Sequence, residues 1–314
     1  MYNNGIGISK DVVTAVALYR ASAAQGNMHA QYNLSVCLEK GEGCERDEVQ
    51  ALSLQKLAAA QDHAGACNSL GVRFHNGNGV LQDDAEALAW YRKAANLGSA
   101  VGMCNLGCMY KNGRAVPIDH LQANIWIQKA AELGNASAQN TLGTQYDEGN
   151  GLPKDHMQAV IWFRKAAEQG NHPAQTNLGI SYEFGEAGTR DLDEAKRWYR
   201  MAAEAGYAKS QYRLGILLLS SASKAPEEAV LWFRRAADQS FEVAMLELSR
   251  SYRNGQGVDV DLVESLRWLL IAKQHGVKVT EQEEQDARNK LTPEQNLTTE
   301  QTAASWIPAS NYRK

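Results

Sequence analysis

The residues of this chain that could perform chemistry are a column of aspartates, five cysteines and seven histidines. A ladder of carboxylates could bind cations or act as acid–base groups. Each aspartate, however, stands where a helix is predicted to begin, and a carboxylate there accepts hydrogen bonds from free backbone amides. We therefore predict that these aspartates are helix caps. They recur roughly every 36 residues, at Asp11, Asp47, Asp83, Asp119, Asp155, Asp191 and Asp261.

The cysteines and histidines offer only an incomplete metal site. Cys104 and Cys108 lie one predicted helical turn apart, and His75 could face them from the preceding helix, which gives two soft ligands and an imidazole. A fourth ligand is missing, so we predict no metal and no cofactor, and thiols that pack as small apolar side chains. Metalloprotease, nucleophile-elbow and phosphate-loop motifs are absent from the sequence. The odd number of cysteines favours free thiols in a reducing compartment.

These residues are carried by a repeated pair of predicted helices. A Leu followed by Gly or Ser recurs about every 36 residues, and a fixed period of this length indicates stacked repeats. A small residue four positions before the Leu and an apolar residue four positions after it share one face of a helix, which we call helix A. Glycines such as Gly41 and Gly77 are expected to end helix A in the left-handed conformation. The recurring leucines are Leu34, Leu70, Leu106, Leu142, Leu178, Leu214 and Leu248.

The second half of each repeat predicts a helix B built from alanines and one large apolar residue. We expect this large residue to pack between helices against the alanines, and the Gly after the Leu of helix A to permit close helix approach. An aromatic ladder that binds sugars or cations is the alternative. The large residues are Leu18, Leu54, Trp90, Trp126, Trp162, Trp198, Trp232 and Trp268.

The repeat reads A-x-x-x-L-G-x-x-Y-x-x-G-x-G-V-x-x-D-x-x-x-A-x-x-W-x-x-K-A-A-x-x-G, most clearly over residues 102–206. This pattern resembles the Sel1-like repeat (SLR), a branch of the tetratricopeptide (TPR) superfamily. The resemblance implies an all-α, right-handed α/α superhelical solenoid of stacked antiparallel helix pairs over residues 1–276, as a half repeat plus seven repeats. It also implies a non-enzymatic scaffold or adaptor, often bacterial, that binds a protein or peptide partner.

Two segments depart from the repeat. The loop around residues 220–226 is two residues shorter and lacks the aspartate, although Pro226 can still begin helix B. Residues 277–314 leave the period, and we interpret them as a C-terminal helical cap, because the end of a solenoid needs a polar outer face. A disordered tail is the alternative, given the low hydrophobicity of this segment.

If the superfamily geometry carries over, the A helices line a concave face. The positions two before the Leu, and two, five and six after it, then point towards a ligand. Side-chain amides there suit an extended peptide, because they both donate and accept hydrogen bonds. Towards the last repeats the face becomes apolar, which predicts an anchoring pocket; packing of residues 216–219 against the shortened loop is the alternative. The predicted binding residues are Tyr32, Asn68, Asn140, Thr176, Glu183, Phe184, Tyr212 and Ile216.

Composition excludes some partners. The net charge is −4, the pI is near 6.0, and both signs of charge are interspersed, so we expect no nucleic-acid partner. No apolar run reaches the roughly 20 residues of a membrane span, so we expect no membrane insertion, and we favour a monomer. The sequence starts within a repeat motif, so we expect the natural start and any targeting segment to lie upstream. We favour the cytoplasm, or delivery into a host cell. A cell-wall-directed hydrolase or small-molecule receptor is the alternative function, and it would require a closed pocket with convergent catalytic groups.

Overall fold

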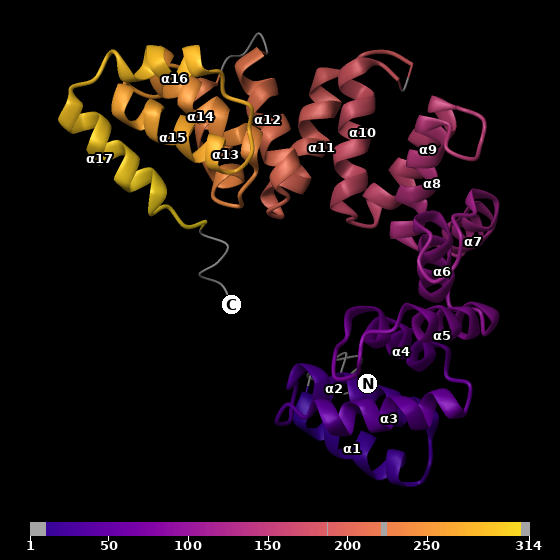
Figure 1. Cartoon of the computed structure of the whole chain (residues 1–314). Coiled ribbons are helices and arrows are strands. Elements are labelled where there is room, and N and C mark those ends of the chain that lie inside the picture. Colours follow the sequence, from indigo (N-terminus) through magenta and orange to yellow (C-terminus); the bar gives the residue numbers. More distant parts are fainter. Residues whose placement is uncertain (1–10, 187, 221–224, 309–314) are drawn as a thin grey trace. The chain divides into compact units, whose positions relative to one another are not determined.

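The computed structural model describes residues 11–186, 188–220 and 225–308. Within these residues it contains only helices and no strand, which confirms the all-α prediction. Figure 1 labels them in chain order. They are α1 (Val12–Ala24), α2 (Met28–Lys40), α3 (Glu48–Ala60), α4 (Ala64–Asn76), α5 (Asp84–Asn96), α6 (Ala100–Asn112), α7 (His120–Glu132), α8 (Ala136–Glu148), α9 (His156–Glu168), α10 (His172–Phe184), α11 (Leu192–Glu204), α12 (Ala208–Ser220), α13 (Pro226–Ala237), α14 (Glu242–Asn254), α15 (Leu262–Gln274), α16 (Glu281–Arg288) and α17 (Pro293–Ala304).

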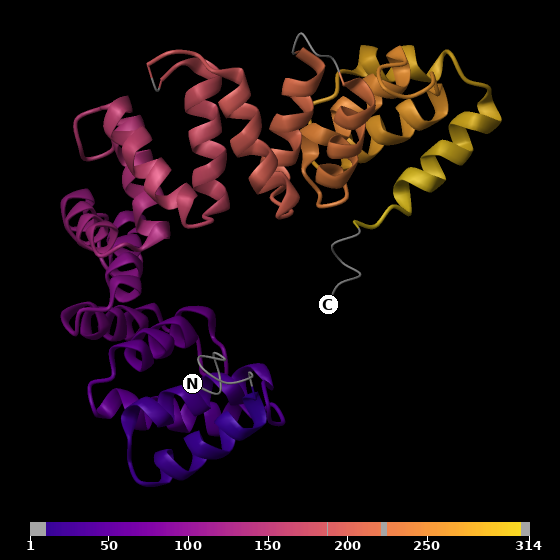
Figure 2. The ribbon, with the colours of Figure 1, turned by 180° about the vertical axis from the view of Figure 1, so that it is seen from behind.

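The chain forms two compact units, and each is described here by itself. Unit 1 comprises residues 1–162 and unit 2 comprises residues 163–314, so that α9 crosses the boundary. The even-numbered helices from α2 to α14 are the A helices, and the odd-numbered helices from α1 to α15 are the B helices. From α1 to α8 in unit 1, and from α10 to α15 in unit 2, helices that are neighbours in sequence pack against each other as antiparallel pairs (Figures 1 and 2). This arrangement confirms the predicted stacking of helix pairs.

The boundaries of the helices follow from local chemistry. Every aspartate of the predicted column accepts a hydrogen bond from an amide in the first turn of a B helix, which confirms the capping interpretation. The A helices end at glycines with positive φ, as predicted: Gly41, Gly77, Gly113, Gly185 and Gly255 among them. Pro226 begins α13 without a side-chain cap before it, while residues 221–224 of the shortened loop lie outside the described residues.

Close approach of helices A and B explains the glycine that follows the repeated Leu. A Cβ atom placed at Gly215 would lie 2.4 Å from Cε1 of Phe233, and one at Gly179 would lie 2.5 Å from Cε1 of Tyr199. Such distances leave no room for a methyl group. The prediction of close packing is therefore confirmed. The corresponding partners in unit 1 are Tyr91 opposite Gly71 and Ile127 opposite Gly107.

The side chain that fills the glycine position is not the tryptophan but the residue after it. The residue after the tryptophan is buried in every repeat that has a tryptophan, for example at Phe233 and Tyr199, both 0% exposed. The tryptophans themselves divide into two groups: Trp198, Trp232 and Trp268 are at most 6% exposed, whereas the three in unit 1 are half-buried. Trp90, Trp126 and Trp162 pack against the core clusters but keep part of their surface exposed, so the predicted packing holds for them without complete burial. One residue turns a helix by about 100°, which is enough to exchange the two positions.

Buried glutamines tie the A helices α2, α8, α10 and α12 to the preceding B helix, a feature that the sequence analysis missed. Gln211 Nε2 donates a hydrogen bond of 3.1 Å to the carbonyl of Ala203, in the last turn of α11. Carbonyls at a helix end have no partner within the helix, so this amide satisfies one of them. The equivalent bonds join Gln31 to Ala23, Gln139 to Ala131 and Gln175 to Ala167.

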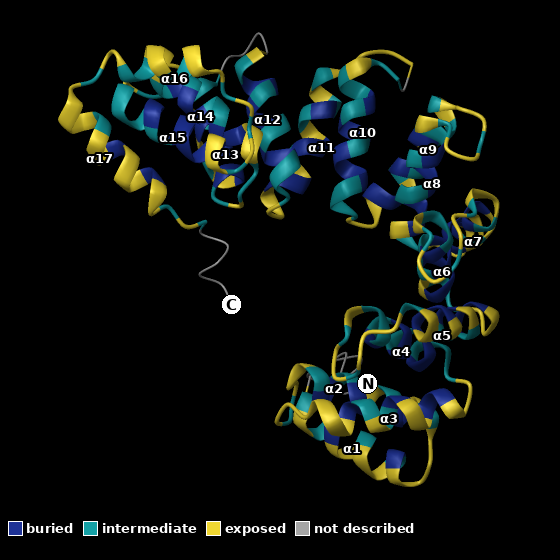
Figure 3. Ribbon diagram, in the orientation of Figure 1, coloured by how far each residue is buried: buried dark blue, intermediate teal, exposed yellow. Residues whose placement is uncertain are grey.

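The helices α16 and α17 pack on α15 at the end of unit 2. The ring of Trp306 meets Trp268 edge-on at 5.9 Å between centroids, and Ala303 of α17 is 1% exposed. The outer surfaces of α16 and α17 are largely exposed (Figure 3). We propose that this segment is the cap of the repeat array. No helix among the described residues combines the length and the apolarity needed to cross a bilayer.

Candidate functional site

One face of α12 carries residues that the other helices of unit 2 leave partly exposed. Lys209, Tyr212, Arg213, Ile216 and Leu219 follow each other at intervals of about one helical turn and are all half-buried. The opposite side of α12 is fully buried against the neighbouring helices. We call these five residues, with Phe184 on α10, the α12 face.

Phe184 is the most exposed aromatic ring of this surface. It is 62% exposed, and Cζ of Arg213 lies 6.0 Å from the centroid of its ring. An arginine at this distance from an aromatic ring is held by a cation–π interaction. Exposed aromatic and arginine side chains are the types that dominate binding energy at protein interfaces.

Glu183 lies beneath Arg213 and is only slightly exposed. Its side chain is 14% exposed, Oε2 accepts a hydrogen bond of 2.6 Å from the hydroxyl of Tyr199, and Arg213 Nη1 lies 3.7 Å from the same oxygen. Burial, and then the bond to Glu183, raises the pKa of Tyr199 well above its usual range, so the hydroxyl stays a donor. The carboxylate therefore orients the guanidinium beside Phe184.

The α12 face is rich in cations. Burial, followed by the nearby charge of Arg213, lowers the pKa of Lys209. On α14, the next A helix, Arg250 is paired with Glu247 at 2.6 Å, while Arg253 is exposed near the end of the helix. Together these residues give the A helices of unit 2 an apolar and basic surface.

The other predicted binding residues of unit 2 differ in accessibility. Thr176 is 0% exposed, and its hydroxyl lies 2.5 Å from that of Ser210 on α12. It therefore joins two A helices and is not available to a ligand. Tyr212 packs on Phe233 and Phe241, with ring centroids 6.1 and 5.5 Å apart, and keeps one side open.

The predicted residues of unit 1 are also engaged within the fold. The ring of Tyr32 stacks on His63 at 4.5 Å, and His63 meets His29 edge-on at 5.0 Å. Asn68 Oδ1 accepts a hydrogen bond of 2.8 Å from Nδ2 of Asn105 on the next A helix. These amides connect adjacent repeats.

Asn140 of α8 is half-buried, and its backbone carbonyl accepts a hydrogen bond of 3.1 Å from the hydroxyl of Thr144. Asn140 is the third predicted binding residue of unit 1. It stands two positions before the repeated Leu, as Asn68 does, and therefore lies on the same side of its A helix. The predicted binding residues of unit 1 are thus polar, in contrast with the apolar and basic α12 face of unit 2.

The thiols and the imidazole that could have formed a metal site have other partners. His75 Nδ1 lies 2.7 Å from Oδ1 of Asp84, so this nitrogen faces a carboxylate. The thiol of Cys104 donates a hydrogen bond to Cys108, which lowers the pKa of Cys108. Both cysteines are free thiols.

Arg213 and Lys209 are the residues of this surface that the sequence analysis missed. The predicted binding positions are those two before the repeated Leu and two, five and six after it. Arg213 stands one before the Leu, but it lies about one turn from both Lys209 and Ile216. If the position one before the repeated Leu had been included among the predicted binding positions, Arg213 would have been found from the sequence.

Fold and surface together define a class: a helical repeat protein that presents its non-repeated side chains on the A helices. The Sel1 repeat family model matches residues 1–27, 29–63, 64–99, 100–135, 136–171, 172–207, 208–241 and 243–277, and the chain belongs to this family. Proteins of this family are in general protein-interaction scaffolds without enzymatic activity. None of the curated proteins compared with the chain matches it.

Solved structures agree with this assignment. A Sel1 repeat protein from Oxalobacter formigenes is 30% identical, with a TM-score of 0.64 over 84% of this chain and 77% of that chain. A protective antigen of uropathogenic Escherichia coli strains, which displays an SLR fold, is 29% identical, with a TM-score of 0.55 over 96% of this chain and 73% of that chain.

Proposed function

We propose that the chain is a non-enzymatic scaffold that binds a peptide or protein segment on the α12 face. The observation that carries this proposal is the pairing of Phe184, 62% exposed, with Arg213, whose guanidinium forms an ion pair with the largely buried side chain of Glu183. A surface ring with a pre-positioned arginine loses little side-chain entropy when a partner binds.

The chemistry of the α12 face specifies the partner. Tyr212, Ile216 and Leu219 form an apolar floor that packs on the core of unit 2 and remains partly exposed. An apolar side chain of the partner would be removed from water there. Because Lys209 and Arg213 border this floor, acidic residues on either side of the apolar anchor would be attracted to the surface. We therefore propose a partner segment with an apolar residue flanked by Asp or Glu.

A random peptide library displayed on phage tests this proposal. Selection on the full chain should enrich peptides with an apolar residue between acidic ones, and a selected peptide, labelled with a fluorophore, then gives dissociation constants by anisotropy. We expect Phe184→Ser and Arg213→Glu each to weaken binding by about tenfold or more, as for central interface residues.

Leu231→Ser provides the matched control. Leu231 is 61% exposed, almost as much as Phe184, but it lies on the B helix α13. Exposed substitutions of this kind change the free energy of unfolding by less than about 0.5 kcal/mol. Equal weakening by Leu231→Ser, or selection of peptides without acidic residues, would refute the proposal.

A further inference from the structure

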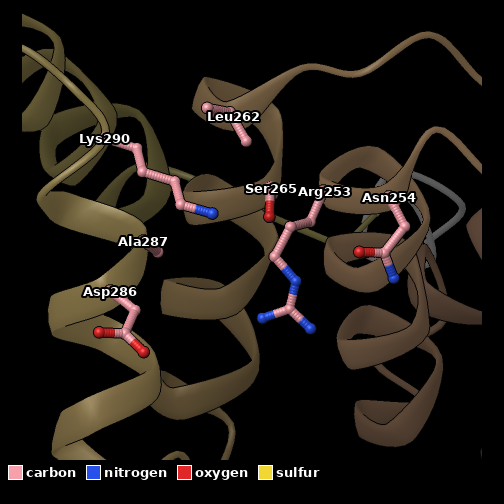
Figure 4. A pocket seen from close by; sticks show the side chains of 7 residues that line it. All are labelled: Arg253, Asn254, Leu262, Ser265, Asp286, Ala287 and Lys290. Atoms are coloured by element: carbon pink, nitrogen blue, oxygen red, sulfur yellow. The ribbon is translucent and has the colours of Figure 1, made fainter.

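A cavity lies at the end of the last A helix of unit 2, where α14, α15 and α16 meet (Figure 4). Its volume is about 370 Å³, within the range of sites that hold a small ligand or a few side chains. It is lined by Arg253 and Asn254 of α14, Leu262 and Ser265 of α15, Asp286 and Ala287 of α16, and Lys290. Figure 4 shows the side chains of Arg253 and Lys290 extending into the space between these helices.

The residues that line the cavity include two cations, Arg253 and Lys290, and one carboxylate, Asp286. Among the described residues, neither Arg253 nor Lys290 forms an ion pair. Asp286 Oδ1 accepts a hydrogen bond of 2.7 Å from Gln282. Glu283 accepts from the amide and the hydroxyl of Thr280 at 3.0 and 2.9 Å, as part of a capping box. The bonds from Thr280, and then the charges of Arg250 and Arg253, lower the pKa of Glu283, so this carboxylate lies within electrostatic reach of Arg253. Among its lining residues the cavity has one more cation than carboxylate.

The other residues that line the cavity favour one type of anionic ligand over another. Ser265 is 3% exposed, and its Oγ donates a hydrogen bond of 2.9 Å to the carbonyl of Ser249. With its proton used in this way, Oγ can only accept, so it suits an N–H group and not a bare oxyanion. Leu262 and Ala287 add apolar surface that suits methylene groups.

We infer that this cavity binds an acidic side chain of the partner segment, with the carboxylate between Arg253 and Lys290. Arginine and lysine together fix a carboxylate by charge-assisted hydrogen bonds. Asn254 supplies a further amide donor, and Ser265 accepts a backbone N–H of the same segment. Arg253 and Asn254 occupy the positions in α14 that Glu183 and Phe184 occupy in α10, so that the cavity continues the same side of the A helices. The identity of the ligand rests on the proposed function.

The first test uses small probes and does not depend on a partner. Succinate or inorganic phosphate is added to the full chain, and acetylation of Lys290 and of Lys278 is followed by mass spectrometry. Lys278 is an exposed lysine between α15 and α16 that does not line the cavity, and it is the matched control. We expect succinate to slow the acetylation of Lys290 only. Equal rates with and without succinate, or stronger protection by phosphate than by succinate, would overturn the inference.

The second test uses the peptides selected on the whole chain. In Arg253→Gln/Lys290→Gln, the affinity should fall about tenfold and the preference for one acidic position should disappear. The substitution Lys278→Gln should change neither. If the double variant binds as the wild type does while Arg213→Glu still abolishes binding, this inference is wrong and the proposed function stands. If the wild-type chain selects no peptide, the proposed function is wrong, and the succinate experiment alone decides whether the cavity is an anion site.

Discussion

Adding one methyl group at Gly215 tests the close contact on which the repeat depends. In an open helix, Gly→Ala stabilises by about 1 kcal/mol. At Gly215 the new Cβ would lie 2.4 Å from Cε1 of Phe233, a ring that is 0% exposed and cannot move into solvent. Overpacking of a core costs about 1–3 kcal/mol. The overpacking cost, less the gain in helix propensity, leaves a net effect of about 0–2 kcal/mol, so we expect Gly215→Ala to destabilise unit 2 by up to about 2 kcal/mol and not to stabilise it.

Urea unfolding followed by far-ultraviolet circular dichroism measures this change. A double-mutant cycle with Phe233→Leu assigns it to the contact, because the smaller side chain should recover part of the loss by about 0.5 kcal/mol or more. Gly107→Ala is the comparison: its Cβ would meet Cγ1 of Ile127 at 2.7 Å, and a flexible aliphatic chain yields more easily than a ring. A gain in stability for Gly215→Ala, or strict additivity in the cycle, would refute this account of the glycine.

Three further perturbations probe single groups. Burial lowers the pKa of His63, whose Nδ1 accepts a hydrogen bond from the amide of Ala66 and so caps α4. The cap therefore contributes stability above pH 6.5, the unperturbed pKa, and this stability is lost as pH falls through the lowered pKa. Hydrogen exchange of the first turn of α4 should become faster in acid, and His63→Asn should remove this pH dependence. The hydrogen bond from Cys104 lowers the pKa of Cys108, so Cys104→Ala should move the pH profile of Cys108 alkylation to higher pH, and an unchanged profile would contradict it. Glu39→Ala should destabilise unit 1 by about 1 kcal/mol in urea unfolding, because Arg73, 3% exposed, loses its ion pair but keeps its hydrogen bonds to Gln55 and Asn78, and the side chain of Glu39 is 42% exposed. An unchanged free energy of unfolding would show that the pair is not needed.

The boundaries of the repeat could be predicted from sequence because they depend on neighbouring residues only. An aspartate before a helix and a glycine after it act on backbone groups within a few positions, so Asp191 and Gly185 lie where the pattern places them. The side chain that fills the glycine could not be assigned in this way. Trp198 and Tyr199 are adjacent, and the spacing of the alanines is compatible with either of them facing helix A.

The site was only partly predictable, because burial on the A helices depends on the next repeat. Phe184 was selected from sequence and is exposed. Thr176 was selected by the same rule, yet the small Ser210 on α12 lets the two helices approach until the hydroxyls meet. Asn68 is likewise bonded to Asn105, two helices later in the chain. Partners of this kind cannot be found from the periodicity of one helix.

Hydrogen–deuterium exchange of the full chain with a library-selected peptide tests the central claim most directly. That claim is that the non-repeated side chains on the A helices of unit 2 recognise a partner, while the repeated residues hold the helix pairs together. Binding should slow amide exchange in residues 208–220 and 242–254, which are α12 and α14, and leave the B helices α11 and α13 unchanged. Protection confined to α11 and α13, or no protection in α12 at saturating peptide, would contradict the account.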